Sequence, residues 1–177
     1  NWEAAKTICP DGWHLPDSSE WQTLFDAVGG QENAGKVLKS KAWDGSDKVG
    51  FNALPAGYWS FTDKEYKELG FLAEFWVNDG NGVTIVHLVS SRETAFWYNL
   101  SKPEDAYSVR CIKGAKPLSS SSVQSSSSSA KSSSSVVSSS SITVSSSSVE
   151  IVKDRAGNEY PVVQIGDQYW MAENLNY

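Results

Sequence analysis

A serine-rich tract between residues 118 and 149 constrains the fold of this chain more than any other feature. It reads LSSSSVQSSSSSAKSSSSVVSSSSITVSSSSV, with isolated Val, Ile and Ala residues between blocks of serine. Such a segment cannot bury enough apolar surface to offset the entropy lost on ordering, so we expect a disordered, flexible linker over 115–149. The folded part must therefore come from residues 1–114 and 150–177.

The composition limits the classes of partner. The 177 residues carry a formal net charge of -6, and the sequence shows scattered lysines without a cluster of arginines. Proteins that neutralise nucleic-acid phosphates present a basic face, so we expect no nucleic acid as a partner. No apolar run approaches the ~18 residues that span a bilayer, so we expect no transmembrane segment in this chain. The opening Asn1-Trp2-Glu3 is typical of the middle of a longer product, and we interpret the chain as a fragment.

The first forty residues predict two or three short helices. Trp2, Ala5 and Cys9 fall at helical spacing before Pro10 ends the run. A better helix is predicted after Asp17, with the pattern of a capping box and an apolar stripe that ends at a Gly-Gly pair. A third helix is predicted over residues 32–40. The residues of the second helix that carry this prediction are Glu20, Trp21, Leu24, Phe25 and Val28.

After Trp43 the pattern changes to turns and short strands. Strands are predicted within FNALPAGYWSF, on both sides of the turn in FWVNDGNGVTIVHLVS, in AFWYNL, and in AYSVRCIK. The tail NEYPVVQIGDQYWMAENL predicts a hairpin that turns at Gly166–Asp167, and an isolated hairpin of this size needs a partner sheet. Helices followed by strands indicate the α+β class.

The two cysteines, Cys9 and Cys111, do not form a C-x-x-C pair, which argues against zinc binding and redox motifs. The residues alone leave either one long-range disulfide or two buried thiols. Closing a loop of about a hundred residues would contribute about 4 to 5 kcal/mol in the chain-entropy model, in an oxidising compartment.

The motifs CPDGWHLPDSSEWQTL, AGKVLKS, GFNALPAGYW and SVRCIK resemble, in this order, the Fibrobacter succinogenes major paralogous domain. The tail DRAGNEYPVVQIGDQYWMAENLNY resembles the opening of the same domain. The element LPDSSEW is in turn similar to one in formylglycine-generating-enzyme, or sulfatase-modifying-factor, domains, which have a C-type-lectin-like fold. That fold, with two to three short helices and small antiparallel sheets, is therefore implied here. In C-type lectins a cysteine at the first helix pairs with one in the last strand, which implies a Cys9–Cys111 disulfide.

The resemblance also implies an unusual domain order. Residues 1–114 correspond to the C-terminal body of one domain, and residues 150–177 to the opening β-hairpin of a second copy. C-type-lectin-like domains bring their termini together, so we hypothesise that the hairpin folds back beside residues 107–113 and completes the first body. This strand complementation could occur within one chain or between chains.

The polar residues near the first cysteine have structural alternatives to a role in chemistry. His14 has no partner at metal-ligand spacing and is expected to be bonded within a tight turn. Asp17 and Glu20 are interpreted as a helix cap, and Trp13 and Trp21 as core residues rather than a ligand platform. We therefore predict no catalytic residues, no metal and no cofactor.

Two activities known in similar folds fit the sequence poorly. FWVNDGNG resembles the calcium-binding triplet of C-type lectins, but Val77 interrupts it and no ladder of acidic residues surrounds it, so a hairpin turn is favoured. Formylglycine-generating enzymes use a separate reactive cysteine pair, and both cysteines here are assigned to the fold. An enzyme of this kind is the least favoured alternative.

Aromatic side chains in the strand-rich half are the remaining candidates for a site. Sugar rings stack on such side chains, and lectin-like folds bind ligands in this half. We predict a non-catalytic, secreted or bacterial cell-surface binding or adhesion module, whose possible partner is a polysaccharide or a cell-surface glycan; the alternative is a structural surface-display module without a small ligand. The candidate ligand-binding residues are Trp43, Tyr58, Trp59, Trp97 and Tyr98.

Overall fold

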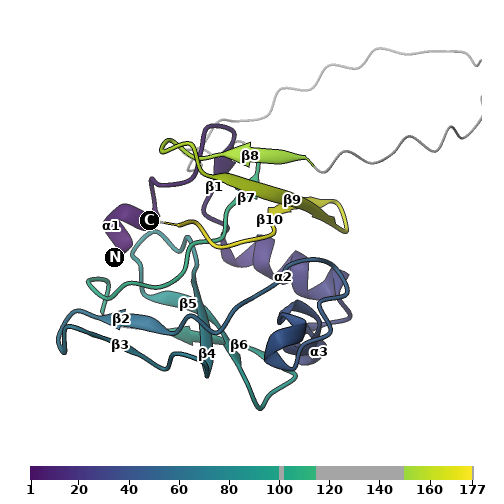
Figure 1. Ribbon diagram of the computed structural model, residues 1–177, viewed down its shortest axis with the longest axis horizontal. Coiled ribbons are helices and arrows are strands. Elements are labelled where there is room, and N and C mark those ends of the chain that lie inside the picture. The colour runs from purple at the N-terminus through teal and green to yellow at the C-terminus, as the bar shows by residue number, and fades with distance from the viewer. Residues whose placement is uncertain (100–101, 115–149, 177) are drawn as a thin grey trace, which may run out of the picture. The chain divides into compact units, whose positions relative to one another are not determined.

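The helices lie within the first 43 residues, and every strand except β1 follows them, in the computed structural model, which describes residues 1–99, 102–114 and 150–176 (Figure 1). This mixture of helices and small antiparallel sheets confirms the α+β prediction. The linker predicted for 115–149 lies outside the described residues. The helices are α1 (Trp2–Ala5), α2 (Ser18–Ala27), α3 (Gln31–Leu38) and the 3-10 helix η1 (Lys41–Trp43).

Helix α2 forms where the capping pattern predicts it. Asp17 is the N-cap, and the capping box with Glu20 is complete. Its buried stripe contains Trp21, Leu24 and Phe25. The helix ends before Gly30, whose φ of 93° lies in the left-handed region that glycine adopts without strain.

Helix α1 is shorter than the predicted run to Cys9. The N–H of Lys6 donates to the carbonyl oxygen of Trp2. The N–H of Thr7 donates to the carbonyl oxygen of Ala4, which is only three residues earlier. Such a bond tightens the final turn and ends the helix. None of the helices in the described ranges is long and apolar enough to cross a membrane.

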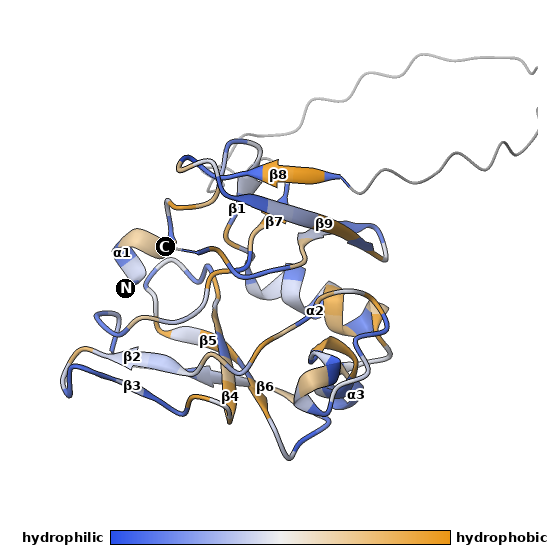
Figure 2. Cartoon of the chain, viewed as in Figure 1, coloured by the Kyte–Doolittle hydropathy of each residue, from blue (hydrophilic) through white to orange (hydrophobic). Residues whose placement is uncertain are grey.

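In the described parts of the chain, ten strands form three antiparallel sheets. The largest has the order β1-β7-β10-β9-β8, the smallest pairs β2 with β3, and the third has the order β4-β5-β6. Figure 2 shows hydrophobic residues along β4 and polar residues along β3. The strands are β1 (Trp13–His14), β2 (Tyr58–Ser60), β3 (Glu65–Lys67), β4 (Leu72–Trp76), β5 (Thr84–Val89), β6 (Ala95–Asn99), β7 (Ile112–Lys113), β8 (Ile151–Lys153), β9 (Glu159–Ile165) and β10 (Gln168–Met171).

The predicted strand over residues 106–113 is mostly irregular, and only β7 is regular. Ala106 bonds with Trp59, whereas Ser108 bonds with Glu74 and Trp76, so this segment crosses between two sheets and does not follow one ladder. The predicted shared face is nevertheless observed, because every second side chain enters one core cluster. These side chains are Tyr107, Val109 and Cys111.

The buried side chains of the described residues form two core clusters. The first lies between α2, α3 and one face of the β4-β5-β6 sheet, and Trp21 and Phe75 are fully buried in it. The second gathers side chains from α1, β4 and the region before β7, among them Trp2 and Trp76. The tail contributes to both clusters, Trp170 to the first and Met171 to the second.

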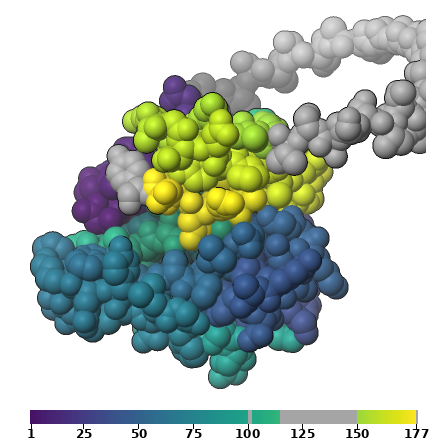
Figure 3. Space-filling model, viewed as in Figure 1, coloured from purple at the N-terminus to yellow at the C-terminus, as the bar shows by residue number. Residues whose placement is uncertain are grey.

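The tail 150–176 belongs to the same sheet as β1 and β7. Trp170 of β10 is in register with Ile112 of β7, and the N–H of Met171 donates to the carbonyl oxygen of Cys111 at 3.1 Å. Figure 3 shows the tail, in green and yellow, lying against the N-terminal part of the chain. The turn between β9 and β10 falls at the predicted Gly166–Asp167.

Candidate functional site

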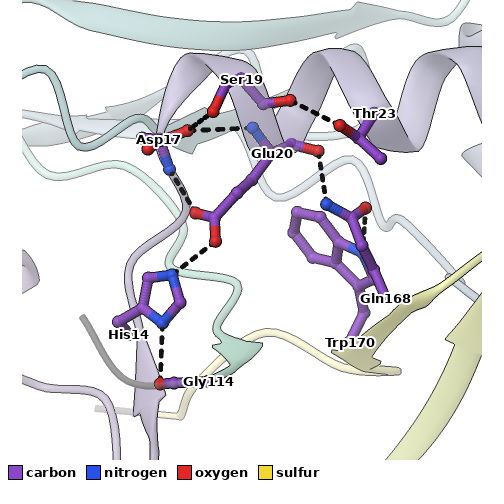
Figure 4. Close-up of polar contacts among 8 residues, drawn as sticks. All are labelled: His14, Asp17, Ser19, Glu20, Thr23, Gly114, Gln168 and Trp170. Atoms are coloured by element: carbon purple, nitrogen blue, oxygen red, sulfur yellow. Dashed lines mark hydrogen bonds and ion pairs between the residues drawn. The ribbon is translucent and has the colours of Figure 1, made fainter. Parts of the chain in front are cut away.

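The corner around His14 connects the start of α2 to the end of β7 (Figure 4). His14 Nε2 lies 2.7 Å from Glu20 Oε1, and His14 Nδ1 lies 3.0 Å from the carbonyl oxygen of Gly114. Both partners are acceptors, so the protonated imidazolium, with two N–H donors, satisfies both. The pKa of His14 is raised, chiefly by the hydrogen bond to Glu20 and against the opposing effect of burial.

The other polar groups of this corner are bonded within the fold. The N–H of Glu20 donates to Asp17 Oδ1, and the N–H of Asp17 donates to Glu20 Oε2, both at 2.9 Å. Gln168 Nε2 donates to the carbonyl oxygen of Glu20 at 3.1 Å, and Trp170 Nε1 donates to Gln168 Oε1 at 3.1 Å (Figure 4). This arrangement is the one expected if His14 and the Asp17–Glu20 pair hold the fold together.

Cys9 and Cys111 form a disulfide, which confirms the predicted pairing. The bond connects the loop after α1 to the residue before β7. Both cysteines of the chain are thereby used by the fold, and neither is a free thiol.

Two of the five predicted aromatic residues come together at the surface. Tyr58 and Tyr98 line one groove of about 610 Å³. Trp59, by contrast, pairs with Tyr66 on the β2–β3 hairpin, with ring centroids 5.0 Å apart, and is not among the residues that line the groove.

The structure places the remaining two predicted aromatic residues in or against the core. Trp43 is only 6% exposed and belongs to the first core cluster. Trp97 packs against Phe25, with ring centroids 5.5 Å apart. Trp43 and Trp97 therefore contribute to the core, and neither is among the residues that line the groove.

Strand alternation explains why Tyr98 faces the groove and its neighbour Trp97 does not. Successive side chains of a strand point to opposite faces of the sheet. Val86 and Trp97 are register partners on the core face, whereas Glu74 and His87 are register partners on the opposite face. The groove lies on this opposite face, and we call it the tyrosine–carboxylate groove, defined by Tyr58, Glu74, His87, Tyr98, Asp105 and Tyr107.

Two buried carboxylates lie at the groove. Glu74 is 4% exposed; its Oε1 lies 3.0 Å from His87 Nδ1, and its Oε2 has no hydrogen-bond partner among the described residues. Asp105 is 2% exposed and accepts from the N–H of Phe61 at 2.8 Å and from the hydroxyl of Tyr107 at 3.4 Å. Glu74 therefore retains an acceptor atom that the fold does not use.

Burial and the nearby carboxylates change the pKa values of two tyrosines of the groove. The rings of Tyr58 and Tyr107 are stacked, with centroids 5.4 Å apart. Burial, and next the negative charges of Glu74 and Asp105, raise the pKa of Tyr58. Burial raises the pKa of Tyr107 further, with the charge of Asp105 as the next cause. Both phenols therefore remain protonated donors at neutral pH.

Sequence reasoning missed the polar residues of the groove. Glu74 sits within LAEFW, where all its neighbours in β4 are buried, and a carboxylate in such a strand is itself a signal of a functional position. Asp105 and Tyr107 carried no comparable signal, because the irregular path of residues 105–111 brings them to the groove.

The turn that resembles a calcium triplet is bonded internally. Asp79 accepts from the N–H groups of Asn81, Gly82 and Val83, as expected for a hairpin turn. Across the described ranges, no group of three or more His, Cys, Asp or Glu side chains is placed to hold a metal ion.

Comparison with known protein families matches residues 1–113 to the Fibrobacter succinogenes major domain. The chain belongs to this family. The match confirms the resemblance seen in the sequence, and no curated protein and no solved structure matches the chain. In this member of the Fibrobacter succinogenes major domain family, the matched region contains every residue of the tyrosine–carboxylate groove, whereas β8, β9 and β10 lie beyond it.

Proposed function

We propose that the chain is a non-catalytic, extracellular module that binds a neutral polysaccharide or cell-surface glycan in the tyrosine–carboxylate groove. The observation that carries this proposal is the unused, buried Oε2 of Glu74 at the groove. A buried acceptor without a partner costs about 1–3 kcal/mol, and more when it is charged. A sugar hydroxyl would supply the missing donor once the Glu74 side chain turns its Oε2 toward the groove.

The aromatic rings of the groove support the same ligand class. Tyr98 is 55% exposed at the groove, and Tyr58 is half-buried against Tyr107. Binding sites combine such apolar surfaces with a few polar groups that fix the orientation of the ligand. The C–H face of a pyranose ring matches a tyrosine ring, while the hydroxyl groups at its edge match Glu74.

The charges around the groove favour an uncharged sugar. Three carboxylates line it, those of Glu68, Glu74 and Asp105, whereas Lys102 is the one lysine among its lining residues that the structure describes. An anionic sugar would bring a further negative charge close to these groups. We therefore expect neutral glycans to bind more tightly than uronic-acid polymers.

The disulfide and the fold support the rest of the proposal. A long-range disulfide is typical of an oxidising compartment, which is consistent with secretion or display at the bacterial surface. The cysteine in the loop after α1 pairs with the cysteine directly before β7, and this long-range pairing supports a C-type-lectin-like fold as part of the proposal.

A glycan array tests the function. We expect the wild-type chain to bind neutral glycans, and Tyr98→Ala to weaken binding at least tenfold. Tyr66→Ala is the matched control, because Tyr66 is also an exposed tyrosine, 63% exposed, but does not line the groove. Absence of binding to any glycan, or equal binding by Tyr98→Ala and the wild type, would contradict the proposal.

A further inference from the structure

We propose that the surface that holds segment 150–176 also accepts this segment from a second copy of the chain, so that two chains exchange their tails. We call residues 1–114 the body and residues 150–176 the tail. The proposal rests on three kinds of contact between them: tail side chains packed in the core of the body, backbone hydrogen bonds, and a buried arginine.

Side chains of the tail pack into the core of the body, at a position that we call the seat. The indole of Trp170 is fully buried, with its ring centroid 5.0 Å from that of Trp21 and 5.8 Å from that of Phe51. Tyr160 and Met171 of the tail are buried in the second cluster. A body without a tail would expose this apolar surface to water, so the body is incomplete by itself.

The backbone of the tail continues the hydrogen bonding of the body. Besides the bond from Met171 to Cys111, the N–H of Leu175 donates to the carbonyl oxygen of Val109 at 3.0 Å. Strand β10 thus lies between β7 of the body and β9 of the tail. Such bonds join main-chain groups, and a tail from a second copy presents the same groups.

Arg110 makes the seat specific for the tail. Its side chain is 1% exposed and lies over the Phe51 ring, with the guanidinium carbon 4.2 Å from the ring centroid. Nη1 donates to the carbonyl oxygen of Met171 at 3.0 Å, and Nε and Nη2 donate to Asn174 Oδ1 at 3.1 and 2.6 Å. Among the described residues no carboxylate forms an ion pair with Arg110, so oxygens of the tail satisfy most of this buried cation.

The covalent connection does not restrict the seat to the tail of the same chain. Segment 115–149 joins body and tail, and an extended segment of that length reaches on the order of 100 Å. An exchanged tail would make the same contacts as the tail of the same chain. The protein concentration therefore decides between the monomer and the dimer with exchanged tails. A tethered partner has an effective concentration of roughly millimolar, so exchange should be rare in dilute solution and grow as the chain is refolded at higher concentration.

Two variants, each with one cysteine added to the native pair, report exchange directly. Lys113 of the body and Glu150 of the tail form an ion pair across the junction. The full-length chains Lys113→Cys and Glu150→Cys are unfolded together in urea at acidic pH, where thiol exchange is slow, then refolded at increasing concentrations and oxidised. The double variant Lys113→Cys/Glu150→Cys shows whether the two positions crosslink within one chain. Lys67→Cys, on β3, replaces Lys113→Cys in the control mixture.

The proposal predicts a disulfide-linked heterodimer of the two variants whose yield rises with refolding concentration and exceeds that of the control mixture. This test applies when the two positions crosslink in the double variant. A heterodimer yield no higher than that of the control mixture at every concentration would then overturn the proposal. If the double variant does not crosslink, light scattering of the refolded wild type decides. A dimer that persists on dilution supports exchange, and a monomer at every refolding concentration contradicts it.

Discussion

Glu74 and His87 face each other across neighbouring strands, and only one of the two carboxylate oxygens of Glu74 is used in this contact. His87 Nδ1 lies 3.0 Å from Oε1, while Oε2 is buried without a partner among the described residues. A fold optimised for stability alone would replace such a carboxylate with a neutral or apolar side chain. In the proposed binding site, the pair would therefore be a position at which ligand binding and stability are opposed.

Glu74→Gln should separate these two properties. We expect glycan affinity to fall about tenfold or more, because a hydrogen bond to a charged group contributes about 1.5–3 kcal/mol. The melting temperature should not fall, because a neutral amide is easier to bury than a carboxylate. Glu65→Gln, which removes an exposed carboxylate from β3, is the control for net charge. Wild-type affinity in Glu74→Gln would rule out the assigned role.

Trp170→Ala should show how much the tail stabilises the fold. Its side chain is fully buried between Trp21 and Phe51, and loss of a buried tryptophan costs about 3–5 kcal/mol. The neighbouring Tyr169 is 39% exposed, so Tyr169→Ala should cost about 1 kcal/mol or less. Urea unfolding measures both free energies, and equal losses in the two variants would show that the tail does not seat in the core.

The His14 corner should make stability depend on pH. The folded state raises the pKa of His14 above its unfolded value of about 6.5. The stabilisation by His14 is therefore complete below about pH 6.5. It is lost as the pH rises through the folded pKa, because between the two pKa values the folded state binds more protons than the unfolded state. The charged groups that act on His14 are Glu20 and Asp17.

Urea unfolding between pH 5.5 and 8.5 measures this dependence. The unfolding free energy of the wild type should decrease across this range relative to that of His14→Gln, whose amide does not titrate. The same slope in His14→Gln and the wild type would assign the pH dependence to other groups.

Reduction of the Cys9–Cys111 disulfide should destabilise the chain strongly. The bond joins residues with a sequence separation of 102. Closing a loop of this length lowers the entropy of the unfolded chain, which in the chain-entropy model stabilises the fold by about 4–5 kcal/mol. This is a large share of the stability of a typical domain. We expect a matching loss in urea unfolding when reductant is added. The variant Cys9→Ala/Cys111→Ala should show the loss without reductant and no further response to it.

The sequence predicted the features that depend on local patterns. The capping residues located α2, the Gly166–Asp167 turn located the tail hairpin, and the family pattern located the disulfide. The features it missed depend on long-range contacts. Strand β1 is two residues long and exists because β7 pairs with it, and β3 consists of polar residues that pair with β2.

The candidate site was predicted in part for a related reason. Tyr58 and Tyr98 were among the predicted residues because aromatic residue types are visible in a sequence. Strand register decides that Trp97 faces the core while Tyr98 faces the groove, and composition does not reveal that register. Glu74, His87 and Asp105 come together only once the sheet and the irregular segment before β7 are in place.

Amide NMR of the labelled full-length chain, titrated with a neutral oligosaccharide selected on the array, tests the central claim most directly. The account predicts saturable shifts that centre on Glu74, His87, Tyr98 and Asp105, with small changes around the His14 corner and at Tyr66. Shifts centred on another surface, or none at saturating oligosaccharide, would contradict the assignment of the tyrosine–carboxylate groove as the binding site.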